Sequence, residues 1–63
     1  MDIDRARKEL RHLLLSRDTS RLSGAFLSIA NDYLNYNYEM SSAMLVSMLT
    51  KLREQPMRLE PAL

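Results

Sequence analysis

Basic side chains near the N-terminus are the groups in this sequence best suited to contact a phosphate. Arg5, Lys8 and Arg11 are three residues apart, which places them near one side of an α-helix. The 63-residue chain nevertheless carries nine Lys and Arg against eight Asp and Glu, a net charge of +1, whereas a dedicated nucleic-acid-binding domain has a large basic excess. We therefore expect the pairs Asp4 with Lys8 and Glu9 with Arg5 on a solvated side. Phosphate contact by the three basic residues is the alternative.

The sequence offers little for catalysis or for binding a metal. It contains no cysteine and a single histidine, His12. Four carboxylates are scattered, without the pairing that a general acid and a general base require: Asp32, Glu39, Glu54 and Glu60. A chain of this length also cannot enclose a large substrate pocket and keep a core. We expect no enzymatic activity, no metal and no cofactor.

Three methionines are arranged as a stripe along one side of a predicted helix. Met40, Met44 and Met48 are four residues apart. A second apolar stripe lies beside them, formed by Leu45, Leu49 and Leu52. Together the stripes cover a wider arc than one packing contact buries. The polarizable thioether of methionine adapts to partners of different shape. We predict that the three methionines bind another protein; the alternative is that both stripes belong to the core.

Tyrosine and asparagine alternate just before this stripe. Tyr33, Tyr36 and Tyr38 are three of the four aromatic residues of the chain. Tyrosine provides a large contact area at low entropic cost, and asparagine adapts its hydrogen bonds, so this composition is typical of binding surfaces. We include the three tyrosines in the predicted protein-binding surface. The alternative is an interhelical turn with Tyr33 and Tyr36 packed inward.

The elements that position these residues are predicted to be helical, because the chain has one Gly, two Pro and a helical spacing of apolar residues. Three helices are expected, at about residues 3–15, 20–35 and 39–55. A single long helix over residues 20–55 is the alternative, since this segment has no proline. The Asn and Tyr residues at 35–38 favour a break, because both are poor helix formers and Asn readily ends a helix.

The size of the chain bears on its stability. Residues 1–55 are expected to form a single helical domain, and residues 56–63 a flexible C-terminal tail, because Pro56 and Pro61 prevent the helix from continuing. In so small a domain, apolar burial offsets the conformational entropy of folding with almost no margin, and no disulfide can help. The expected fold is therefore all-α, a small helical hairpin or three-helix unit completed by homodimerisation.

These features together favour a non-catalytic helical regulator or adaptor that binds, modulates or chaperones a larger protein. The alternative is a dimeric nucleic-acid-binding regulator that uses the basic side of the first helix. No membrane association is expected, since the longest apolar run, residues 43–49, has seven residues and is interrupted by Ser47. The absence of cysteine favours a cytoplasmic location.

Overall fold

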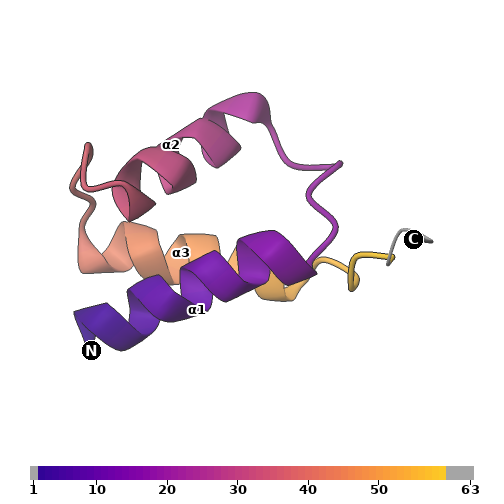
Figure 1. The fold of residues 1–63 in the computed structure, drawn as a ribbon, viewed down its shortest axis with the longest axis horizontal. Helices are drawn as coiled ribbons and strands as arrows, with labels where there is room; N and C mark the ends of the chain where they lie inside the picture. Colours follow the sequence, from indigo (N-terminus) through magenta and orange to yellow (C-terminus); the bar gives the residue numbers. More distant parts are fainter. Residues whose placement is uncertain (1, 60–63) are drawn as a thin grey trace.

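Three α-helices make up the computed structural model of this protein, which describes residues 2–59 (Figure 1). They are α1 (Ile3–Ser16), α2 (Gly24–Leu34) and α3 (Ser42–Arg53). There is no β-strand within residues 2–59, so the predicted all-α class and the three-helix unit are confirmed. None of these helices is long and apolar enough to cross a lipid bilayer. The homodimer stays a prediction.

Each helix begins after a residue whose side chain caps its first turn. Asp2, Ser23 and Ser41 are the N-caps of α1, α2 and α3. The hydroxyls of Ser23 and Ser41 each accept a hydrogen bond at 3.1 Å from the backbone N–H three residues further on. Such a bond satisfies an N–H that has no partner inside the helix. Helix α2 thus begins at Gly24 and α3 at Ser42, later than the predicted starts at residues 20 and 39.

Helix α2 ends in a Schellman motif, so the long segment after α1 forms two helices and not one. Asn35 is the C-cap, and Tyr36 follows in the left-handed conformation with a φ of 61°. The N–H of Tyr36 donates to the carbonyl of Tyr33 (3.1 Å), and the N–H of Asn37 donates to that of Asp32 (2.9 Å). The left-handed residue turns the chain out of the helical path and lets α3 fold back.

Ten buried apolar side chains form the core at the junction of the three helices. They are Ala6, Leu10, Leu13, Ala30, Tyr33, Leu34, Leu45, Met48, Leu49 and Leu52. Helix α1 packs mainly against α3 and to a smaller extent against α2, and in Figure 1 α1 and α3 lie next to each other with α2 above them. Leu10, Ala30 and Leu52 are completely buried, so each of the three helices contributes to the centre of the core.

The first part of the predicted C-terminal tail runs beside the end of α1. The N–H of Asp18 donates to the carbonyl of Pro56 at 2.8 Å, and the N–H of Arg58 donates to the carbonyl of Ser16 at 2.7 Å. The guanidinium of Arg58 donates to two further carbonyls near the end of α1. The bonds from Arg58 satisfy carbonyls at the end of α1 that have no hydrogen-bond donor within the helix. The flexibility of the tail stays a prediction, and residues 60–63 lie outside the described residues.

Candidate binding sites

Two members of the predicted protein-binding surface lie in the core. Tyr33 is 3% exposed and Met48 is 5% exposed. Met48 lies three residues after Leu45 and four before Leu52, and this spacing places all three on the side of α3 that faces the core. In the folded chain Tyr33 and Met48 therefore pack against other residues of the same molecule.

A second part of the predicted surface remains at the exterior. The side chain of Met44 is 36% exposed and that of Tyr38 is 39% exposed. The Tyr38 hydroxyl lies 3.8 Å from the Met44 sulfur and donates a weak hydrogen bond to it. We refer to these two residues as the Met44–Tyr38 patch. Met40 is partly buried against the core, and the 74% exposed Tyr36 lines a different site.

The structure separates the three basic residues of the nucleic-acid alternative. Lys8 and Arg11 share a pocket of about 310 Å³ with Tyr36, whereas Arg5 lines another depression. The residues around the first pocket are Asp4, Arg7, Lys8, Arg11 and Tyr36. We call this site the basic–aromatic pocket. It combines Lys8 and Arg11, which were predicted to contact nucleic acid, with Tyr36, which was predicted to contact a protein. Helix α1 supplies the charges, and the α2–α3 connection supplies the ring.

Arg7 links the charges of this pocket to the ring. Its guanidinium carbon lies 4.2 Å from the ring centre of Tyr36 and 4.5 Å from that of Tyr33. A cation over an aromatic face is attracted by the ring quadrupole. Polar contact with the side chain of Tyr36 first, and then of Tyr33, raises the pKa of Arg7 further above its ordinary value, and an arginine is a permanent cation in any case. Arg7 lies at the edge of the basic side of the helix, and its contact with the two rings could not be predicted from the sequence, because the rings belong to a segment almost thirty residues away.

The backbone of Tyr36 is strained. A left-handed conformation costs an L-amino acid about 1–2 kcal/mol, and glycine is the usual residue at this position of a Schellman motif. Tyr36 is 74% exposed, so burial of this residue does little to offset the cost. Strained, exposed residues are concentrated at functional sites. Tyr36 is therefore the residue of the basic–aromatic pocket for which a role in binding is the most natural interpretation.

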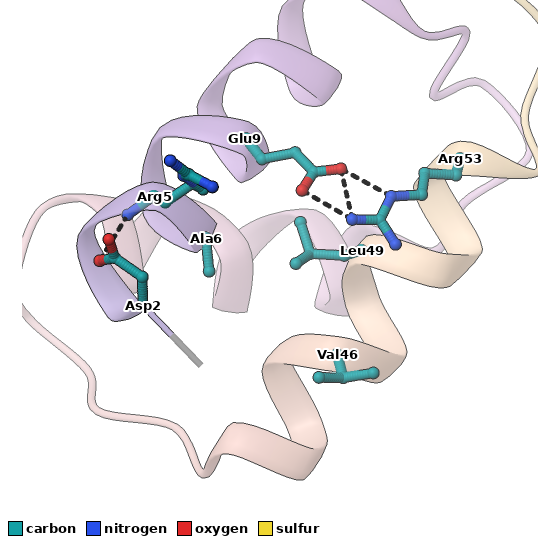
Figure 2. Close-up of a pocket in the computed structure, with 7 residues that line it drawn as sticks. All are labelled: Asp2, Arg5, Ala6, Glu9, Val46, Leu49 and Arg53. Carbon is teal, nitrogen blue, oxygen red and sulfur yellow. Dashed lines mark hydrogen bonds and ion pairs between the residues drawn. The ribbon is translucent and has the colours of Figure 1, made fainter.

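The other depression lies between α1 and α3 and has a volume of about 250 Å³. Figure 2 shows the seven residues that line it: Asp2, Arg5, Ala6, Glu9, Val46, Leu49 and Arg53. Ala6, Val46 and Leu49 form an apolar floor. The carboxylate of Asp2 is already engaged by the N–H groups of the first turn of α1. The site can receive a small apolar side chain and presents no free acid–base pair.

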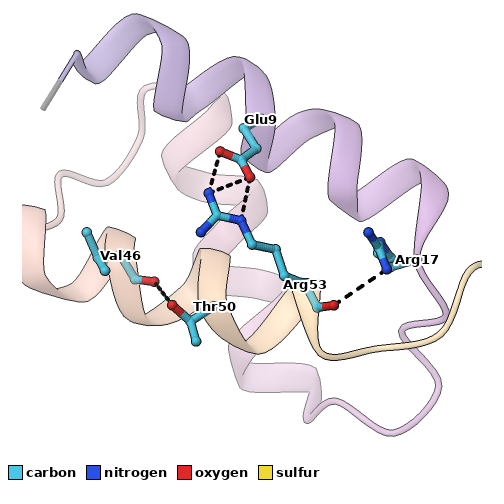
Figure 3. A network of polar contacts seen from close by, with 5 residues as sticks. All are labelled: Glu9, Arg17, Val46, Thr50 and Arg53. Atoms are coloured by element: carbon cyan, nitrogen blue, oxygen red, sulfur yellow. Dashed lines mark hydrogen bonds and ion pairs between the residues drawn. The ribbon is translucent and has the colours of Figure 1, made fainter.

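A bidentate ion pair closes one end of this depression. The Nε and Nη2 atoms of Arg53 each donate to a carboxylate oxygen of Glu9 at 2.6 Å (Figure 3). The backbone carbonyl of Arg53 accepts a long hydrogen bond from Arg17 (3.5 Å). This is the one ion pair among residues 2–59, so the predicted pairs of Glu9 with Arg5 and of Asp4 with Lys8 are wrong. The packing of α3 on α1 brings Arg53 opposite Glu9, so that its guanidinium binds both oxygens of the Glu9 carboxylate.

Metal ligands do not converge within the described residues: no three His, Asp or Glu side chains lie close enough to hold an ion there. The side chain of His12 is exposed on α1. The chain matches no protein-family model, and no curated protein and no solved structure shows significant similarity to it.

Proposed function

We propose that this protein is a non-catalytic helical adaptor that binds a larger protein in the cytoplasm and modulates or chaperones it. Its contact surface in this proposal is the Met44–Tyr38 patch. The observation that supports it is the contact of 3.8 Å between two side chains that are each more than a third exposed. A thioether adapts to the shape of a partner, and a tyrosine adds apolar area with a polar end.

Self-association belongs to the same proposal. Leu15 and Met57 are 72% and 60% exposed. A second copy that covers them would stabilise the folded chain by about 25 cal/mol for each Å² of apolar surface buried, which matters in a domain with a small core. Light scattering should give twice the chain mass of 7.3 kDa, and the melting midpoint should rise with protein concentration. A single-chain mass with a midpoint independent of concentration would contradict self-association and leave the adaptor role untouched.

The partner surface can be tested with a matched pair of variants in α3. A tagged parent, Tyr38→Ala/Met44→Ala and Val46→Ala are used as baits in extracts of the source cells, and captured proteins are identified by mass spectrometry. Val46 is the control, because it is an apolar residue of the same helix with 44% exposure. We expect the parent and the control to retain one partner that the double variant loses, while all three give the same helical circular dichroism.

Salt separates this proposal from the nucleic-acid alternative. Phosphate contacts lose affinity steeply between about 50 and 200 mM salt, whereas a contact made by methionine and tyrosine depends little on salt. Capture that persists at the higher salt agrees with the adaptor role. Capture that disappears there, or is abolished by nuclease, or is equally strong in the double variant, would contradict it.

A further inference from the structure

We propose that the basic–aromatic pocket binds a nucleoside monophosphate unit, with the base stacked on Tyr36 and the phosphate paired with Lys8 and Arg11. The unit is a free nucleotide or the phosphorylated end of a single strand. This inference goes beyond the proposed adaptor role, because it concerns another surface and another class of ligand.

The ring of Tyr36 has one face available for stacking. Arg7 lies over the ring at 4.2 Å from its centre, and residue Tyr36 as a whole is still 74% exposed. Because Arg7 covers one face of the ring, a base would stack on the opposite face. Aromatic side chains of this kind stack on nucleobases in proteins that bind single strands. Because Arg7 and the Schellman motif already hold the ring, little conformational freedom is lost when a base stacks on it.

Two cations of the pocket are available to a phosphate. Lys8 and Arg11 lie on exposed positions of α1, three residues apart and therefore on one side of the helix. Neither has a carboxylate within ion-pair distance among residues 2–59, since the one ion pair there joins Glu9 and Arg53. A phosphate that binds them therefore does not have to displace an internal partner.

The charge and volume of the pocket indicate a small ligand with one phosphate. Arg7, Lys8 and Arg11 with Asp4 give a net charge of +2 at neutral pH, and a phosphate monoester carries about −1.5 to −2 there. A volume of about 310 Å³ is at the lower end for a ligand site. Asp4 adds an acceptor for a ribose hydroxyl or for an amino group of the base.

The strain at Tyr36 is the independent reason to assign a ligand to the ring. Glycine would form the same turn without the left-handed strain. A tyrosine at this position accepts the left-handed backbone and places an exposed aromatic side chain in one pocket with Arg7, Lys8 and Arg11. An acidic peptide would be attracted by the cations alone and has no use for that ring, so the combination favours a nucleotide.

Chemical-shift titration of the full chain tests the proposal. Adenosine monophosphate, adenosine and inorganic phosphate are added separately at low salt. We expect the monophosphate to shift residues 4–11 and 36, and to bind at least fivefold more tightly than either component, which corresponds to a stacking contribution of about 1 kcal/mol. A monophosphate that binds no better than inorganic phosphate would overturn the proposal.

Variants separate the two halves of the site. Tyr36→Gly should bind the monophosphate no better than phosphate, while Tyr36→Phe keeps the parent affinity. Lys8→Gln/Arg11→Gln should bind it no better than adenosine. Arg5→Gln is the matched control, since it removes a cation of the same helix outside the pocket. Parent affinity in Tyr36→Gly, or an equal loss in Arg5→Gln, would refute the assignment.

Two further ligands identify the source of the nucleotide. A 5′-phosphorylated adenine oligonucleotide that binds more tightly than the monophosphate, through Tyr36, indicates a strand end; equal affinity indicates the free nucleotide. A glutamate-rich peptide that binds at the pocket when the monophosphate does not would assign the site to a protein and overturn our proposal. Tyr38→Ala/Met44→Ala should leave monophosphate binding unchanged, so failure of the adaptor role is distinguished from failure of this one.

Discussion

Replacing Tyr36 by alanine and by glycine isolates the strain that the structure places at this residue. Both substitutions remove the ring and its contact with Arg7, so that contribution cancels when the two variants are compared. Alanine keeps the left-handed penalty of about 1–2 kcal/mol, which glycine avoids. Glycine in turn costs about 0.5–1 kcal/mol more in chain entropy. The balance predicts that Tyr36→Gly is more stable than Tyr36→Ala by about 0.5–1 kcal/mol.

The same pair of substitutions at Ser28 is the control. Ser28 is an exposed residue inside α2, where alanine is favoured over glycine by about 1 kcal/mol. Urea and thermal melts followed by circular dichroism give the four stabilities. A difference of 1 kcal/mol moves the midpoint of so small a domain by about 4–8 °C, which is readily measured. The order should therefore reverse between the two sites, with glycine melting higher at 36 and lower at 28.

An alanine variant at position 36 that is as stable as the glycine variant, or more stable, would refute this reasoning. It would mean that Tyr36 does not hold a left-handed conformation in solution, and the preformed ring of the basic–aromatic pocket would lose its basis. The comparison with the parent is informative as well. The exposed stack on Arg7 contributes about 0.5–1 kcal/mol, similar to the net gain from glycine. Tyr36→Gly should thus remain folded, as the binding experiment requires.

Three further predictions concern the core, the first turn after α1 and the C-terminal segment. Met48→Ala should cost about 2–5 kcal/mol and Met44→Ala less than about 1, because the first side chain is buried and the second is not; equal midpoints in urea would contradict this. The Ser20 N–H bound to Asp18 lowers the pKa of that carboxyl, so its contribution to stability is present above the ordinary aspartate pKa of about 4 and is lost as the pH falls through the lowered value. The melting difference between the parent and Asp18→Asn should accordingly shrink from pH 6 to pH 2, and a constant difference would argue against it. Arg58→Ala should lower the stability by about 1 kcal/mol in urea melts, since its guanidinium donates two hydrogen bonds near the end of α1; no change would show that these bonds do not persist in solution.

The helical class followed from local features of the sequence. Helix spacing, low glycine and proline content and capping residues act over a few positions, so they can be recognised without knowing the fold. The break after α2 was favoured for the same reason, since the Asn and Tyr residues there weaken a helix. The starts of α2 and α3 were placed too early because several Ser, Thr and Asn residues competed as caps, and only the finished turns select Ser23 and Ser41.

The surfaces depended on contacts between distant segments. The sequence showed the methionine stripe, but the packing of α3 in the core decided that Met48 is buried and Met44 is not. The sequence also showed carboxylates and cations on α1, but Glu9 pairs with Arg53 because α3 packs beside α1.

The stacking of Arg7 on Tyr36 is the clearest case of what tertiary structure alone decided. The two residues lie on different elements almost thirty positions apart, and their contact requires both the left-handed turn after α2 and the packing of α2 on α1. Periodicity reports which side of a helix is apolar, and composition reports which groups can carry charge. Neither periodicity nor composition specifies how far apart two helices lie, and the stacking of Arg7 on the Tyr36 ring depends on that distance.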